Sequence, residues 1–260
     1  MNTFFIRHFF YLIFLLLGGL VIFEPVYGKG ISVGGTRVIY DASKREATLS
    51  VRNSADGIPH LIQSWADDFS DPGFKAPFII TPPLFRLDAG KENILRIVFT
   101  GETNLPQDRE SVFWLNVKAI PAVEKTEANQ LTIAIKTRIK LFYRPTSLRT
   151  DEANDAWKKL TFIYVDGVVV IQNPTPYFVS LFSLQIGHDN VPMPPMIAPF
   201  SESLVPIINK VDVTVSVTWQ AINDYGAITS PSTAQFADKS IFPDSVDSHG
   251  MRLSESVAAP

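Results

Sequence analysis

The feature that most constrains the fold is a period of two in the apolar residues, which recurs in short segments along the chain. Residues 47–52 alternate apolar and polar side chains, and such alternation is typical of a strand with one buried face. Further short apolar segments follow, separated by turn residues such as those of Asn53–Gly57 and Asp88–Lys91. No segment keeps a helical period over a dozen residues, so the pattern predicts an all-β sandwich.

A second series of strand-like segments begins after Tyr143–Leu148. The polar stretch Arg149–Asp155 is interpreted as the end of a linker. Two apolar runs then flank Asp166 and Gly167, a dipeptide that favours a tight β-hairpin. Further strands are predicted over residues 178–186, 203–208 and 211–222. The chain is therefore predicted to form two sandwiches, of which the second is the smaller.

The N-terminus resembles a secretory signal. Arg7 and His8 precede the apolar run Phe9–Phe23, which is followed by Glu24, Pro25 and the pattern Val26-Tyr27-Gly28. A basic start, an apolar core and a small residue at the end predict export and cleavage after Gly28. An uncleaved membrane anchor is the alternative, for which the run is short.

Composition narrows the class of protein further. The chain of 260 residues has 46% hydrophobic residues and a net charge of -3, which argues against general disorder and gives no basic stripe for nucleic acid. It has no cysteine, so an exported fold must rely on its core without disulfides. The predicted division is a signal peptide over 1–28, domains over 29–147 and 148–240, and a disordered tail over 241–260.

Residues that could support catalysis or metal binding are scattered. His60, His188 and His249 lack metal-ligand spacing, and no nucleophile elbow, P-loop or zinc motif occurs. Asp67, Asp68 and Asp71 are interpreted as a solvated loop. No catalytic residue, metal site or cofactor is therefore predicted.

Several spaced segments carry a more specific signal, namely Thr36–Arg37, Thr81–Pro83, Leu105–Ser111, Leu131–Pro145, Asn173–Tyr177 and Ile222–Gly226. In this order they resemble the periplasmic pilus (fimbrial) chaperones of the chaperone–usher pathway, over roughly residues 30 to 228. The resemblance implies two immunoglobulin-like β-sandwich domains, set at an angle with a cleft between them. It also implies a periplasmic protein that binds pilus subunits, delivers them to an outer-membrane usher, and has neither a cofactor nor bond chemistry.

The resemblance assigns a role to two cations. Arg37 and Lys140 match the pair that holds the C-terminal carboxylate of the subunit in the cleft. Two cations in a partly desolvated cleft bind a carboxylate through charge-assisted hydrogen bonds, and arginine can do so with two parallel bonds. Without the resemblance, a lone arginine or lysine on a strand usually faces water.

Leu131, Ile133 and Ile135 match the strand that the family inserts into the incomplete sandwich of the subunit. In this mode backbone hydrogen bonds give affinity, and alternating apolar side chains fill a groove. Alternation alone favours plain core instead. Strict alternation also places Lys140 on the face opposite Ile135, so twist or a bulge must re-aim it, or the cleft must wrap the strand edge. Self-association of the empty protein is expected through this exposed edge.

Glu110, Arg144 and Asp224 match a buried charge triad that joins the two domains in the family. A guanidinium between two carboxylates can fix the interdomain angle, although burying charge is costly. Taken without the resemblance, these are three unrelated surface charges.

One connection places the chain within a branch of the family, and its C-terminal end departs from the family pattern. The connection over Pro121–Asn129 is short, and together with the missing cysteines it resembles the short-loop branch, with a short connection between strands F1 and G1. The family usually ends in another clear strand, whereas here Ile241–Pro243 is followed by polar residues. The rival interpretations are a secreted β-sandwich adhesin or binding module, and the pilus subunit itself, which has one incomplete sandwich.

Overall fold

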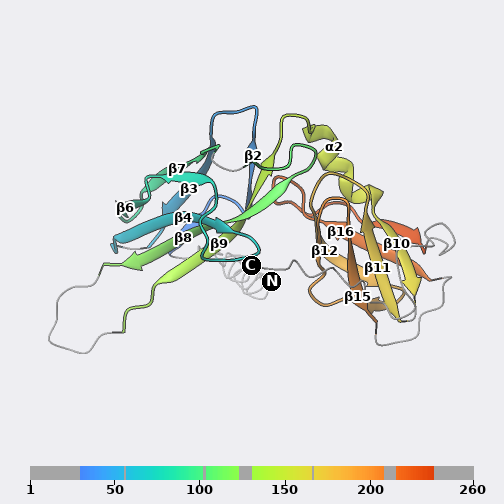
Figure 1. Cartoon of the computed structure of the whole chain (residues 1–260). Coiled ribbons are helices and arrows are strands. Elements are labelled where there is room, and N and C mark those ends of the chain that lie inside the picture. Colours follow the sequence, from blue (N-terminus) through green and yellow to red (C-terminus); the bar gives the residue numbers. More distant parts are fainter. Residues whose placement is uncertain are drawn as a thin grey trace, which may run out of the picture.

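The structure, a computed structural model, describes residues 30–55, 57–101, 104–122, 131–165, 167–207 and 215–236. They form two β-sandwiches that meet at an angle (Figure 1). The predicted signal peptide, most of the predicted short connection and the predicted tail lie outside these residues. In the part of the chain that is described, no helix is long and apolar enough to cross a membrane.

The first sandwich packs a four-stranded sheet against a five-stranded one. The four-stranded sheet has the order β1-β3-β7-β5, with bounds Ile31–Val33, Ala47–Asn53, Glu92–Phe99 and Phe78–Thr81. The five-stranded sheet has the order β2-β9-β8-β4-β6, with bounds Arg37–Asp41, Ile135–Arg144, Ser111–Pro121, His60–Asp68 and Leu84–Leu87.

Alternate residues of both sheets form the core of this sandwich. Val51, Leu95, Ile97, Leu115 and Leu141 are fully buried, and the residues between them face outward. Each such side chain contributes about 1.5–3 kcal/mol through burial. The predicted alternation is therefore confirmed, and it determines which side chains of β9 lie on the outer face of the sheet.

In the second sandwich, the described residues form eight strands in two sheets. The smaller sheet has the order β10-β11-β15, with bounds Thr161–Val165, Val168–Asn173 and Ser201–Pro206. The larger has the order β13-β12-β16-β17, with bounds Asp189–Asn190, Val179–Ile186, Ser216–Ala221 and Ser232–Gln235, and β14 (Met196–Ile197) pairs with β12. Val165 lies opposite Val168, so β10 and β11 form the predicted hairpin.

The predicted linker end at Arg149–Asp155 is wrong in part, because a short helix forms there. Helix α2 spans Thr150–Asp155, and a 3-10 turn follows over Ala156–Lys159. Asp151 and Glu152 lie in the first turn, where the helix dipole favours acidic side chains. A six-residue helix is too short to show a period, so the polar composition alone was misleading.

In the segment Leu131–Pro145, strand β9 begins only at Ile135. The strand predicted over 211–222 is described over Ser216–Ala221, and residues 211–214 lie outside the described part of the chain. Asp67 and Asp68 end β4 and do not lie in a loop, and Asp67 is buried.

Candidate functional site

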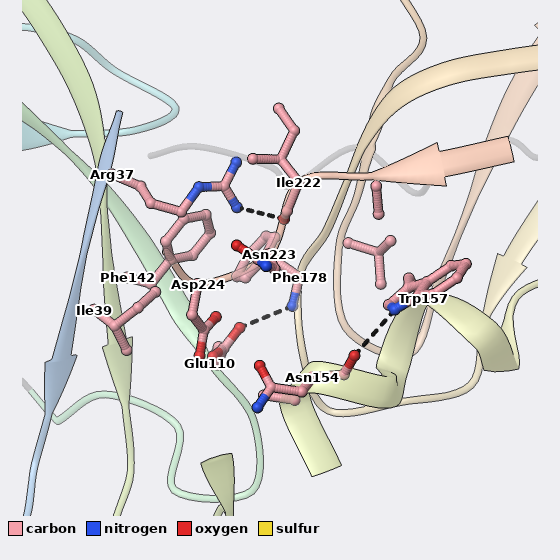
Figure 2. A pocket seen from close by; sticks show the side chains of 13 residues that line it. Arg37, Ile39, Glu110, Phe142, Asn154, Trp157, Phe178, Ile222, Asn223 and Asp224 are labelled. Atoms are coloured by element: carbon pink, nitrogen blue, oxygen red, sulfur yellow. Dashed lines mark hydrogen bonds between the residues drawn. The ribbon is translucent and has the colours of Figure 1, made fainter. Parts of the chain in front are cut away.

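The two sandwiches enclose a cleft between them, shown in Figure 2. The first sandwich contributes Arg37 from β2 and Phe142 from β9 to its wall. The second contributes Phe178 and the loop after β16, which carries Asp224. The rings of Phe142 and Phe178 lie 5.7 Å apart, so an apolar contact joins the domains at the base of the cleft.

Arg37 extends from β2 across the cleft (Figure 2). Its Nη1 donates to the carbonyl oxygen of Ile222 at 3.0 Å, and its guanidinium lies 5.6 Å from the ring centre of Phe142. Its Nε is buried and has no hydrogen-bond partner among the described residues. Buried donors are almost always paired, so this nitrogen is an exception within the described part of the chain.

Lys140 lies beside Arg37, because β2 and β9 pair in parallel with these two residues in register. Its Nζ is 3.5 Å from Ser180 Oγ of the second sandwich. Burial lowers the pKa of Lys140, and the positive charge of Arg37 lowers it further. Neither cation forms an ion pair with a residue that the structure describes, so the cleft favours an anion.

The structure shows how Lys140 reaches the cleft although alternation places it on the face opposite Ile135. The register between β8 and β9 runs without a shift from Ser111 and Tyr143 to Ala119 and Ile135. Strict alternation therefore holds, and no bulge re-aims Lys140. The cleft lies on the outer face of the five-stranded sheet, whereas Ile139, next to Lys140, is buried in the core.

The predicted insertion strand is exposed, although its apolar residues occupy the same alternate positions as the core-facing residues of β9. Leu131, Ile133 and Ile135 are 88%, 66% and 65% exposed, because this part of the chain projects beyond the sandwich (Figure 1). Only Ile135 lies within β9. β2 pairs with β9 from Lys140 onward, so over 135–139 the edge of β9 away from β8 has no partner strand in the described chain.

Glu110, Arg144 and Asp224 contact one another, as the family resemblance implies. Arg144 Nε donates to Glu110 Oε1 at 2.7 Å. Its Nη1 and Nη2 donate to the two carboxylate oxygens of Asp224 at 2.8 and 3.1 Å. The side chains of Arg144 and Glu110 are 4% and 3% exposed. Although burial opposes the charge of Arg144, hydrogen bonds to Asp224 and the nearby negative charges raise its pKa.

This triad joins the two sandwiches. Arg144 and Glu110 belong to the first domain, whereas Asp224 belongs to the second. The second oxygen of Glu110 accepts from the backbone N–H of Phe178 at 2.9 Å. The second domain also approaches the first closely at Gly226, where a Cβ would lie 2.5 Å from Thr36 Oγ1. The φ of Gly226 is +82°, which also favours glycine. The contacts are therefore specific to one relative placement of the domains.

A polar network on the same outer face was not predicted. Asp67 accepts from Trp65 Nε1 at 3.0 Å and from Asn116 Nδ2 at 3.0 Å. Asn116 in turn accepts from Arg138 Nε at 3.1 Å, and the guanidinium of Arg138 lies 5.3 Å from the ring centre of Trp114. The solvated-loop interpretation of Asp67 is therefore wrong. The sequence feature that could have indicated this burial is the alternation of β4, which places Asp67 on the same outward face as Trp65.

Comparisons with known proteins give a consistent family. Residues 30–149 match the model of the pili and flagellar-assembly chaperone, PapD N-terminal domain. Residues 155–233 match that of the pili assembly chaperone PapD, C-terminal domain. The chaperone protein FimC of Escherichia coli K12 is 40% identical over 230 residues, which cover 85% of this chain and 92% of FimC. The chaperone protein LpfB of Salmonella typhimurium is 41% identical over 209 residues, covering 79% and 89%.

Solved structures agree. A chain of the Salmonella enterica SafA pilin complex with the SafB chaperone has a TM-score of 0.72 at 31% identity, covering 81% of this chain and 98% of that chain. The Escherichia coli chaperone DraB has a TM-score of 0.70 at 34% identity, covering 80% and 97%. These likenesses span both sandwiches and give no support to a secreted adhesin. The chain therefore belongs to the family of pili assembly chaperones that the PapD domains define.

Proposed function

We propose that this protein binds pilus subunits in the cleft and along the free edge of β9, and delivers them to an outer-membrane usher from the periplasm. The observation that carries the proposal is the pair Arg37 and Lys140, two half-buried cations. The carboxylates near Arg37, those of Asp224 and Glu110, are already bound to Arg144. Burial disfavours the two positive charges, and a bound terminal carboxylate offsets that cost through charge-assisted hydrogen bonds.

The direction of the bound segment follows from the pairing of the strands. A peptide whose carboxylate lies at Arg37 and Lys140 meets the unpaired edge of β9 over 135–139. It ends beside Lys140 and therefore runs parallel to β9, in line with β2, which also pairs in parallel. The projecting apolar side chains of Leu131, Ile133 and Ile135 then lie alongside the same segment.

The relatives support the same partner class. One solved relative is described as a pilin in complex with its chaperone, and several curated relatives are named as fimbrial chaperones. The predicted signal peptide supports export. Delivery to an usher rests on membership in this family alone.

The inserted-strand role gives a first prediction. Ile133→Asp is expected to leave the free protein folded, because Ile133 is 66% exposed. It is expected to abolish subunit capture, since a charge enters an apolar groove. Circular dichroism of the purified variant, beside recovery of a co-expressed pilus subunit on the tagged chaperone, measures both effects.

Ile139→Asp is the matched control, because Ile139 has the same parity on β9 and is 8% exposed in the core. This change is expected to unfold the first domain. A folded Ile133→Asp protein that recovers subunits normally would refute the strand role. Sedimentation of the empty wild-type protein should also show self-association that Ile133→Asp removes.

A pH dependence follows from the lowered pKa of Lys140. A bound carboxylate raises this pKa again, so the contribution of Lys140 to binding is complete below the free-state pKa, declines above it and is lost as the pH rises through the bound-state pKa. Recovery of subunits, normalised to neutral pH, should therefore fall at alkaline pH in the wild type. Lys140→Arg should delay that fall, because a guanidinium keeps its charge. Identical profiles for the two proteins would contradict this assignment.

A further inference from the structure

The small sheet of the second sandwich has an apolar outer face. Residues of one parity, among them Phe162, Val169 and Ile171, belong to the core. The opposite parity includes Ile163 on β10 and Val170 on β11, which lie directly opposite each other. An outward face of a sandwich normally carries polar side chains. This one is apolar at its centre.

These outward side chains are buried. Ile163 is 2% exposed, Val165 is 6% exposed and Val170 is 0% exposed, and they form a cluster separate from the core. Leu204, opposite Val170 on β15, is 49% exposed. Within the described ranges, no further hydrophobic residue is recorded as packing on this cluster. These exposures are those of this chain alone, so the chain itself supplies the cover.

The other sheet of the same domain shows the contrast. On its outer face, Thr218 and Thr233 are hydrogen-bonded to each other at 3.0 Å, and Ser183 donates to Gln220 at 3.2 Å. Polar pairs of this kind need no cover. The need for a cover is thus specific to the face that contains Ile163 and Val170.

The chain after β17 starts in the right place to supply that cover. The ring of Phe236 lies 5.7 Å from the ring of Tyr164 on β10, which is the edge strand of the small sheet. The sequence continues from Ala237 to Pro260, and its first large apolar residues are Ile241 and Phe242. Extended chain spans about 3.3 Å per residue, and neighbouring strands lie about 4.8 Å apart. Five or six residues therefore suffice to pass the β10 edge and reach β11.

We propose that Ile241 and Phe242 of the C-terminal segment dock on the outer face formed by Ile163, Val165 and Val170. The family match ends at residue 233, so this docking is an addition that the PapD domain itself does not contain. It hides an apolar face and an edge strand that otherwise favour association with other chains.

The absence of cysteine from the chain makes the test direct. Val170→Cys introduces a single thiol on the outer face, and its rate of reaction with a soluble thiol reagent reports the cover. Ending the chain after Phe236 is expected to raise this rate about tenfold or more, because local opening is then no longer needed. Val169→Cys, on the core face of the same strand, should react equally slowly in both lengths of chain.

A point change in the full-length chain locates the contact. Phe242→Asp should raise the reactivity of the Val170→Cys thiol as truncation does, whereas Leu253→Asp should leave it protected. Circular dichroism checks that each variant is folded. A thiol that stays protected in the truncated protein would overturn the proposal. Protection that disappears on dilution would identify a second copy as the cover, which also overturns it.

Discussion

Replacing either Arg37 or Lys140 with alanine is expected to abolish subunit capture while the protein stays folded. Removing one partner of a desolvated charge pair costs about 2–5 kcal/mol of binding. The free protein loses no ion pair, because neither cation has one with a described residue. Burial already lowers the pKa of both groups, so removing Lys140 relieves a penalty in the free protein. Pull-down from the periplasm at matched protein levels measures the loss.

Lys136→Ala is the matched control for this experiment. Lys136 lies on the same strand and on the same outward parity as Lys140, and it is exposed. Its removal should change capture little, since an exposed charge contributes about 0–1 kcal/mol. Normal recovery of subunits by either cleft variant would contradict the carboxylate site. Equal loss in all three variants would show that only overall charge matters.

Arg144→Ala is expected to cause the largest loss of stability. The change leaves Glu110 buried without its partner, at a cost of about 3–5 kcal/mol. For a chain of this size that corresponds to a melting temperature roughly 6–20 °C lower. Glu110→Ala and Asp224→Ala should act in the same direction, because each removes one of the two carboxylates that bind the buried guanidinium of Arg144. Thermal unfolding followed by circular dichroism measures the three variants.

Arg149→Ala provides the comparison for a surface pair. Arg149 donates to Asp151 at 2.7 Å, but the two side chains are 69% and 65% exposed. Such a pair contributes little, so its melting temperature should stay near that of the wild type. If all three triad variants also melt like the wild type, the triad has no structural role.

The sequence predicts most of the fold because one physical pattern dominates it. Period-two alternation in segments such as 47–52 corresponds directly to strands with one buried face. Asp166-Gly167 specifies a hairpin by its backbone preference alone. The cleft residues were found differently. Arg37 and Lys140 lie 103 positions apart, and only the resemblance placed them together before the β2–β9 pairing was seen.

The remaining features depend on tertiary context. The sequence shows that the side chains of Lys140 and Ile135 point to opposite faces of β9. It cannot show that the start of β9 extends beyond the core, which leaves Ile135 exposed. Asp67 is buried because Trp65 and Asn116 supply donors from a neighbouring position and a neighbouring strand. Alternation likewise gives no sign that Ile163 and Val170, which lie on an outward face, are buried.

We propose that the cleft holds one pilus subunit by its terminal carboxylate. The most direct measurement is purification of the tagged protein from periplasm together with a co-expressed subunit, either native or extended by several residues at its C-terminus. The account predicts an equimolar complex with the native subunit and none with the extended one, because extension moves the carboxylate away from Arg37 and Lys140. Equal recovery of both subunits, or of neither, would contradict it.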